Sequence, residues 1–465
     1  MGLVHKLYKI GSLLNDDDIK AMIENTNFKD SEHIVVTIDF NIQNDKLTET
    51  PKIKHSSLDN IKTFFTKKIG GTSNSYYLYP NFEFQDEKDL YKKFQAISHT
   101  LKNSIMIYAN NNNQALAKLI FDYVDKYNID ELGLKNYKQD DYFLILLING
   151  KSFYELMPEI LENYIDVFVE PHIDNDKKGA TLKECVDIIN NKSEICGYNP
   201  NIKFFTMDNY DDGFKIQIIN KMPMSKDTAK AVKKGWMFAI NYLRFYYKGL
   251  EYIIIPSMID YDEVVFKDMI YFLRESKGGL GSFASREESF IWLLDEQINS
   301  YKNINGFTLD IFFTDVNLTN LSVKIFATLE DVLPSKIRKV ANLMQQQRIS
   351  DSIDIIKGDK NEPKTIYLRD YFGTTELFKR SRKLKTLDNK ILQEKIVLAK
   401  ILLGYSKIKY QELLKRFEYF REFEFDGTKK LDDNGVKKWI SFPNSYIENE
   451  DRVLKFLQEI NAIKG

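Results

Sequence analysis

The side-chain types that usually carry catalysis are present in this sequence, but they form no recognisable catalytic pattern. The five histidines are scattered singly, and no pair has the i,i+4 spacing with which a helix binds a metal ion. The glycine-rich stretch Gly278–Ser282 lacks the lysine that a phosphate-binding loop needs. We therefore expect no catalytic residue and no cofactor. The histidines are His5, His33, His55, His99 and His172.

Acidic residues and cysteines are the remaining candidates for metal binding. Asp16–Asp18 and Asp211–Asp212 could hold a divalent ion in a nuclease or polymerase, but such residues are commoner in turns and helix caps. Cys185 and Cys196 are the wrong distance apart for one zinc knuckle, and no second pair follows. We expect no bound metal. Two cysteines also provide no disulfide framework, which indicates a reducing compartment.

A basic, glycine-hinged loop gives a clearer indication of nucleic-acid binding. Glycines let a backbone approach a groove, lysines neutralise phosphate, and an asparagine can pair with an adenine edge. Tyrosines follow the loop, and an ordinary hairpin turn with core tyrosines explains the same pattern. The candidate residues are Lys67, Lys68, Gly70, Gly71, Thr72 and Asn74, followed by Tyr76, Tyr77 and Tyr79.

Three further stretches are candidate nucleic-acid contacts. A run of asparagines offers amides that could contact bases, although helix capping alone also explains it. The run at residues 379–385 holds five basic residues in seven and is the strongest phosphate-binding candidate, with a solvated helix face as its alternative. A basic helix is predicted after Pro334. The candidate residues are Asn111, Asn112 and Gln114, then Lys379, Arg380, Arg382, Lys383 and Lys385, and finally Lys336 and Arg338.

Charge is distributed unevenly along the 465 residues. Residues 335–465 hold 28 Lys and Arg against 19 Asp and Glu, whereas residues 1–334 hold 38 against 48. A basic C-terminal part on an acidic body suggests a polyanion partner for the former, and a solvated helical surface is the simpler alternative. The hydrophobic content of 43% is enough to bury at least two cores.

The elements that must position these residues centre on the stretch Gly306–Val340. Two apolar runs rich in β-branched and aromatic residues, separated by Asp315–Asn320, predict a hairpin. Pro334 ends the strand pattern, and Ser335 is the predicted cap of the next helix. The chain mixes strands and helices before this point and is helical after it. The fold class is therefore α+β, with a mixed body at 1–334, including a polar insert near 171–200, and a basic helical bundle at 335–465.

Shorter patterns predict the other elements. Helices are expected at 1–14, 86–103, from the asparagine run to residue 127, 226–247, 262–275, 288–302, 390–403 and 409–420. Strands are expected at 34–42, 105–110, 142–148 with an Asn149–Gly150 turn, from 201 onward, and 250–259. No apolar run is long enough to cross a membrane, and the N-terminus lacks a signal-peptide pattern. We expect a soluble, cytoplasmic protein.

Four stretches, in order, resemble the large subunit of the type I-B CRISPR surveillance complex (Cascade). They are LYKIGSLL, IKFFTMDNYDDGF, GWMFAINYLRFYYKGLEYIIIPSM and IFFTDVNLTNLSVKIFATLEDVLPSKIRKV. Many members of that family carry two CxxC pairs that bind zinc. Here Cys196–Gly197 resembles a remnant of the first pair, and the segment that begins at Met222 replaces the second without a cysteine, so the zinc site is not carried over.

The resemblance implies a non-catalytic subunit of an RNA-guided antiviral complex. Such subunits recognise the motif flanking the target, promote R-loop formation, stabilise the displaced strand and help recruit a helicase–nuclease. The implied partners are CRISPR RNA, target double-stranded DNA, the backbone and 5′-handle-binding subunits, small subunits and the helicase–nuclease, with no membrane. The resemblance also implies that an internal start could produce the C-terminal bundle as a free small subunit. Met344 is the last methionine in the chain, and Val340, if encoded by GUG, is an alternative start. The other interpretation is that Met344 is a core methionine and the bundle exists only as part of the full chain.

Two other functions are compatible with the residues. One is a metal-dependent nuclease or nucleotidyl transferase that uses scattered carboxylates, which divalent-metal-dependent activity of the purified chain would indicate. The other is a structural assembly protein without a nucleic-acid role, which absence of salt-sensitive DNA binding would indicate.

Overall fold

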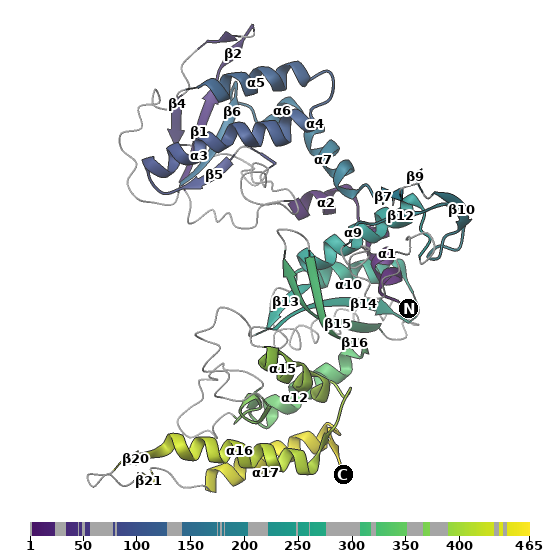
Figure 1. The fold of residues 1–465 in the computed structure, drawn as a ribbon, viewed down its shortest axis with the longest axis vertical. Helices are drawn as coiled ribbons and strands as arrows, with labels where there is room; N and C mark the ends of the chain where they lie inside the picture. The colour runs from purple at the N-terminus through teal and green to yellow at the C-terminus, as the bar shows by residue number, and fades with distance from the viewer. Residues whose placement is uncertain are drawn as a thin grey trace. The chain divides into compact units, whose positions relative to one another are not determined.

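The computed structural model contains both helices and sheets, which confirms the predicted α+β class (Figure 1). The chain divides into two compact units. Unit 1 comprises Met1–Asn241 and Val316–Val323, and unit 2 comprises Tyr242–Asp315 and Lys324–Gly465. The structure describes residues 2–23, 34–44, 46–48, 52–55, 78–79, 81–127, 142–173, 175–176, 179–180, 182–202, 222–247, 250–259, 261–275, 307–317, 322–350, 366–372, 389–431, 437–439 and 444–465.

Unit 1 is built around a four-stranded sheet of order β4-β1-β6-β5. The two central strands are parallel, and the two edge strands run antiparallel to their neighbours. Every residue of β6 is buried, as expected for a central strand covered on both faces. The strands are β1 (Ile34–Phe40), β4 (Lys52–His55), β5 (Asn81–Phe84) and β6 (Tyr142–Ile148), and a small pair beside them consists of β2 (Ile42–Gln43) and β3 (Lys46–Leu47).

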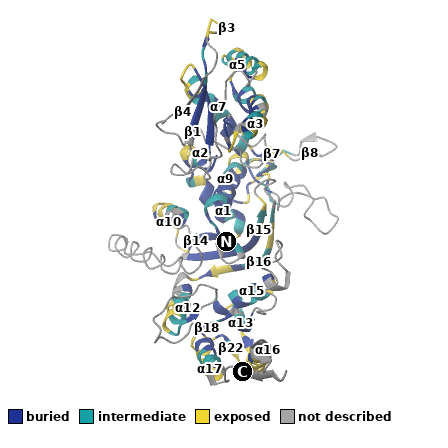
Figure 2. Ribbon diagram, turned by 90° about the vertical axis from the view of Figure 1, so that its left-hand side faces the viewer, coloured by how far each residue is buried: buried dark blue, intermediate teal, exposed yellow. Residues whose placement is uncertain are grey.

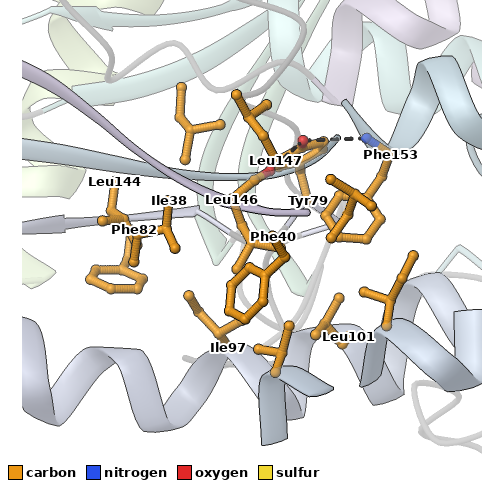
Figure 3. Close-up of a cluster of buried hydrophobic side chains, with 14 of the residues drawn as sticks. Ile38, Phe40, Tyr79, Phe82, Ile97, Leu101, Leu144, Leu146, Leu147 and Phe153 are labelled. Carbon is orange, nitrogen blue, oxygen red and sulfur yellow. Dashed lines mark hydrogen bonds between the residues drawn. The ribbon is translucent and has the colours of Figure 1, made fainter. Parts of the chain in front are cut away.

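The core of this sheet joins its strands to the helices that follow them in the chain. Phe40 of β1 and Leu146 of β6 lie near Ile97 of α3 (Figure 3). The fully buried Tyr79 hydroxyl donates to the Leu146 carbonyl at 2.8 Å and accepts from the Phe153 amide at 3.3 Å, so Tyr79 is a core tyrosine. The helices around this core are α3 (Glu87–Thr100), α4 (Met106–Tyr108), α5 (Gln114–Lys126), α6 (Phe153–Leu156) and α7 (Glu159–Val169).

Most of the segment 105–110, predicted as a strand, is helical instead, from Ile105 to Tyr108. A π-helical turn, η3 (Leu101–Ile105), continues α3 directly into α4. Leu101 and Ile105 are buried whereas Ile107 is 59% exposed, a helical rather than an alternating spacing. Packing of one face against the sheet overrides the β-propensity of the isoleucines.

The first helix, α1 (Leu3–Leu13), crosses α9 (Lys226–Tyr242) at unusually close range. An added Cβ on Gly11 would lie 1.7 Å from the Ala231 carbonyl oxygen, and one on Gly235 would lie 2.0 Å from the Leu7 carbonyl oxygen. The two backbones therefore approach through a pair of glycines, as small residues allow when helices pack closely. The predicted opening helix is confirmed, and α2 (Asp16–Ile23) follows it.

The polar region 171–200 consists of short antiparallel pairs. β10 pairs with β11, β12 with β7, and β8 with β9. These pairs lie in sequence between α7 and α9. Their bounds are β7 (His172–Ile173), β8 (Asn175–Asp176), β9 (Gly179–Ala180), β10 (Lys183–Val186), β11 (Ser193–Cys196) and β12 (Tyr198–Asn199).

Unit 2 contains a second four-stranded sheet, of order β13-β14-β15-β16, in which β14 and β15 are largely buried (Figure 2). The predicted helix 226–247 ends earlier, at Tyr242, and Arg244–Tyr247 form β13. Phe245 pairs with Tyr252 of β14, so cross-strand aromatic contact replaces the last helical turn. The elements are β13 (Arg244–Tyr247), β14 (Leu250–Met258), α10 (Glu263–Glu275), β15 (Phe307–Asn317) and β16 (Ser322–Val332).

The predicted hairpin is present as β15 and β16, but the helix after it begins differently from the prediction. Pro334 is the first helical residue and Leu333 is the N-cap, so Ser335 lies inside α12 (Pro334–Gln346). Proline is well suited to the first helical position because its missing N–H would have no helical partner there. Asp331 has a φ of 55°, which breaks the strand conformation just before this junction.

Helices and strands of unit 2 after β16 contribute residues to one hydrophobic core, which joins Val340 of α12 to Phe417 and Phe456. The predicted boundary at 334 lies inside unit 2, and both this boundary and the bundle arrangement stay predictions. The elements are β17 (Ile349–Ser350), β18 (Ile366–Tyr367), α13 (Arg369–Phe372), α15 (Asn389–Leu402), β19 (Ile408–Lys409), α16 (Tyr410–Thr428), β20 (Lys429–Leu431), β21 (Lys437–Trp439), α17 (Asn444–Glu459) and β22 (Ile463–Lys464).

The other predictions along the chain fall into two groups. The helices near 86, 114, 262, 390 and 409, the strands at 34, 142 and 250, and the Asn149–Gly150 turn are confirmed, the last by left-handed φ values of 52° and 72°. The helix 288–302 and most of the strand after 201 lie outside the described residues. Among the described helices, none is both long and apolar enough to span a bilayer.

Candidate nucleic-acid interface

Two of the predicted contact segments lie outside the described residues, and their roles stay predictions. They are the glycine-hinged loop and the basic run. The residues concerned are Lys67, Lys68, Gly70, Gly71, Thr72 and Asn74, together with Lys379, Arg380, Arg382, Lys383 and Lys385.

The asparagine run forms an exposed polar tip, Asn110–Gln114, between α4 and α5. The Asn110 side-chain oxygen accepts from the Asn113 amide at 3.0 Å, and Glu159 accepts from the Asn113 side chain at 2.7 Å. Burial would raise the pKa of Glu159, but hydrogen bonds from the Asn113 side chain and from the backbone amides of Glu159 and Asn110 hold it below its ordinary value. The tip is therefore anchored at Asn110 and Asn113, while Asn111 and Asn112 remain exposed to solvent.

The end residues of the tip have structural contacts. Asn113 occupies the N-cap position of α5, but its side chain makes no capping hydrogen bond, contrary to the predicted asparagine cap. The Gln114 side-chain nitrogen donates to the carbonyls of Met106 at 3.0 Å and Ala109 at 2.8 Å. Gln114 thus fastens the tip to the end of α4, and a base contact from it stays a prediction.

Lys336 lies in a cluster of lysines in unit 2. Its Nζ donates to the Ile460 carbonyl at 3.2 Å. Burial, and then the positive charges of Lys339 and Lys407, lowers the pKa of Lys336. Lys407 in turn donates to the Asn461 side chain at 3.0 Å. Both lysines are therefore held against the turn that precedes β22.

The pair β19 and β22 extends this group. These two-residue strands are parallel, with Ile408 opposite Ile463 and Lys409 opposite Lys464. Ile408 is buried, whereas both of these lysines are exposed. Together the residues form the C-terminal lysine cluster, which consists of Lys336, Lys339, Lys407, Lys409 and Lys464.

Within the part of the chain that the structure describes, Lys339, Lys409 and Lys464 have no carboxylate partner. Several unpaired cations in one place attract a polyanion, and each phosphate contact releases a counterion. Of this cluster, the sequence predicted only Lys336. The available signals were the Lys-Ile-Lys alternation of residues 407–409 and the Ile-Lys pair at residues 463–464. Arg338 lies in α12, but its side chain is not among those that the structure describes.

Hydrogen bonds connect the neighbouring strands that contain Cys185 and Cys196. The Cys196 thiol donates to the Cys185 carbonyl at 3.6 Å, and burial, followed by a side-chain hydrogen bond with Cys185, raises the pKa of Cys196 to about 12. Gly197 donates to the Met224 carbonyl at 3.1 Å, which places the segment that begins at Met222 beside Cys196.

Asp187 fastens this junction. Its fully buried carboxylate accepts from the Ser225 amide at 2.7 Å and from the Ile189 amide at 2.8 Å. Burial would raise the pKa of Asp187, but these hydrogen bonds lower it. Among the residues with assigned positions, no group of three metal-ligating side chains is present. A carboxylate clasp formed by Asp187 therefore joins the turn after β10 to the segment that begins at Met222.

One family model matches this chain. Residues 183–332, from the first residue of β10 to the last residue of β16, match the central domain of CRISPR-associated protein TM1802. No curated protein matches the chain. The family match covers about a third of the sequence and supports a CRISPR-associated protein with a role in CRISPR defence.

Proposed function

We propose that this chain is the non-catalytic large subunit of a cytoplasmic type I-B CRISPR surveillance complex. In this role it recognises the motif that flanks the target in double-stranded DNA, promotes R-loop formation and helps recruit the helicase–nuclease. The match of residues 183–332 carries the proposal. The third resembling stretch lies inside that region, and most of the fourth does as well.

The C-terminal lysine cluster supports a separate contact with displaced DNA. Lys339, Lys409 and Lys464 are exposed and sit in the basic part of the chain. Single-stranded DNA is bound through such cations with strong salt dependence. We therefore assign the displaced strand to this cluster and to the basic run at 379–385.

Reconstitution tests the function directly. The complex is assembled with guide RNA, with or without this chain, and binding is measured to target DNA that carries different flanking sequences. We expect flanking-sequence-dependent binding only when the chain is present, and no strand cleavage by the purified chain with Mg²⁺ or Mn²⁺. Cleavage would favour the nuclease alternative, and binding without salt dependence would favour a purely structural role.

The cluster has its own test. Replacing Lys339, Lys409 and Lys464 by alanine should lower the slope of log affinity against log salt by about 2, since each single-strand phosphate contact contributes about 0.7. Lys336 is left unchanged because it holds the Ile460 carbonyl. An unaltered slope would contradict the assignment. Exposed lysines of unit 1 serve as the matched control triple, namely Lys88, Lys92 and Lys183.

The position of the internal start decides how much of the C-terminal core a free small subunit would contain. Met344 packs at the edge of the C-terminal core, while Val340 is only 5% exposed within it. A product that begins at Met344 lacks Val340 and most of α12, whereas one that begins at position 340, if Val340 is encoded by GUG, keeps one more turn of α12 and carries the initiator methionine at this core position. We expect the longer fragment to be the more stable. Intact-mass measurement on a complex expressed from the native gene identifies the start, and a single full-length species would rule out internal initiation.

A further inference from the structure

A cavity in unit 1 is lined by residues that belong neither to the polar tip nor to the lysine cluster. Its volume is about 270 Å³, and it is bounded by the end of α7, by α9 and by the residues after β12. Trp236 and Met237 of α9 are almost fully buried in its wall, while His172 and Asn201 on its rim are exposed. We call this cavity the Lys233 pocket, after the lysine that also lines it.

Lys233 places a buried ammonium in this mostly apolar wall. The residue is 8% exposed, and its Nζ donates to the Glu170 carbonyl at 2.9 Å and lies 5.4 Å from the centre of the Phe168 ring. An ammonium has three N–H donors, and among the described residues Lys233 uses one of them in a hydrogen bond, which leaves two for a ligand. The Glu170 carboxylate itself pairs with Lys226 at 2.6 Å. A buried donor without an acceptor is costly, which favours a ligand that brings one.

Asn201 and His172 add two polar side chains to the lining of the pocket. Asn201 has a left-handed φ of 54°, and its amide donates to the Asn199 side chain at 2.9 Å. This turn fixes the Asn201 backbone at the mouth of the pocket. His172 lies on the rim in β7. An amide and an imidazole can each donate or accept hydrogen bonds along the edge of a planar ligand.

Size and chemistry together select the ligand. The cavity volume of about 270 Å³ lies just below the range of about 300 Å³ and more that is usual for pockets that bind drug-sized ligands. Aromatic walls suit a flat ring, and the lysine suits a carbonyl or phosphate oxygen. An apolar peptide side chain would leave the ammonium without an acceptor, and a paired base is too large for a single cavity of this volume.

We propose that the Lys233 pocket binds one unpaired nucleotide, whose base lies against Trp236 and Phe168 and whose keto or phosphate oxygen accepts from Lys233. This inference rests on the proposed function, because the nucleotide comes either from the guide RNA or from an opened DNA strand. Stacking of a base on an aromatic side chain is the usual way in which proteins hold an unpaired base.

Photo-crosslinking in the assembled complex tests the proposal with the wild-type chain. 5-Iodouracil, which crosslinks to aromatic and methionine side chains, is placed at one position at a time in the guide RNA or in either DNA strand. We expect one unpaired position to crosslink to the tryptic peptide 235–244, which contains Trp236 and Met237. The nucleic acid that carries this position identifies the source of the nucleotide.

Two variants sharpen the result. Lys233→Met should lower the crosslink yield about tenfold by removing the charge-assisted hydrogen bond. Lys230→Met, on the same helix but outside the pocket, should leave the yield unchanged. Target-DNA binding is measured on the same samples. Normal binding without a crosslink to peptide 235–244 from any position would overturn the pocket alone, whereas wild-type complex without target binding would overturn the proposed function.

Discussion

The close approach of α1 and α9 at Gly11 and Gly235 predicts that alanine at either position destabilises the protein. In an ordinary helix interior, replacing glycine by alanine stabilises the helix by about 1 kcal/mol. At Gly235 the new Cβ would lie 2.0 Å from the Leu7 carbonyl oxygen, about 1.4 Å short of ordinary contact. Because the obstacle is backbone, a side-chain rotation cannot relieve it, and the two helices must separate.

The magnitude follows from these opposing effects. Overpacking of a close contact costs typically about 1–3 kcal/mol, and a backbone obstacle places this site at the upper end. After subtraction of the propensity gain, we expect Gly235→Ala to lower the free energy of unfolding by about 2 kcal/mol. Gly11→Ala should act similarly, and the double variant should lose less than the sum, because helices already separated by one alanine accommodate the second.

Urea unfolding measures this effect. Trp236 lies next to Gly235 and is 4% exposed, so its fluorescence follows unfolding at this site. Trp292 and Trp439 are replaced by phenylalanine so that Trp236 is the one tryptophan left in the chain. Gly2→Ala is the control, because its added Cβ meets nothing within 4 Å, and it should change the free energy of unfolding by less than about 1 kcal/mol. Stabilisation by Gly235→Ala would refute the close crossing.

Three further predictions concern other sites. Asp187→Asn should lower the free energy of unfolding by about 2 kcal/mol in urea titrations, while EDTA leaves the wild-type midpoint unchanged, because the clasp consists of hydrogen bonds to a carboxylate. Burial lowers the pKa of Lys233 from 10.5 to about 8, and the negative charge of Glu170 opposes this shift. Between pH 8 and pH 10.5 the Lys233 side chain is therefore protonated in the unfolded chain but neutral in the folded chain. Stability relative to Lys233→Met should therefore rise from pH 8 to 10.5, and a flat difference would contradict it. Lys67→Ala with Lys68→Ala should weaken target binding at every flanking sequence in filter-binding assays, whereas Asn74→Ala should reduce discrimination between flanking sequences.

Elements with strong local patterns were predictable from the sequence. Residues 142–148 form one apolar run bounded by an Asn-Gly turn, and they became the fully buried β6. The opening helix and the hairpin at β15 and β16 likewise carry their periodicity within the segment itself. In each case the local pattern and the tertiary burial favour the same structure.

The errors occurred where local pattern and packing disagree. Residues 105–110 have the composition of a strand, yet most of them continue a helix against the sheet. Residues 244–247 continue a helical spacing, yet their aromatic side chains pair with β14. In both places the deciding contacts come from distant parts of the chain, which a window of neighbouring residues does not contain.

The C-terminal lysine cluster lay beyond sequence reasoning for a similar reason. Lys336 and Lys464 are at opposite ends of the basic segment, and strands of two residues are too short to give a reliable alternation. Only the parallel pairing of β19 with β22 brings Lys409 and Lys464 together. Basic composition predicted that a polyanion site would lie in this part of the chain but could not indicate which lysines form it.

The sequence of α9 combines two requirements. Gly235 is needed where the helix meets α1, because no side chain fits between the two backbones. Lys233, Trp236 and Met237 line the pocket. Gly235 thus lies in the sequence between two residues that line the pocket, Lys233 and Trp236. Because movement of α9 away from α1 would also shift the pocket wall, the close crossing gives the Lys233 pocket a rigid support.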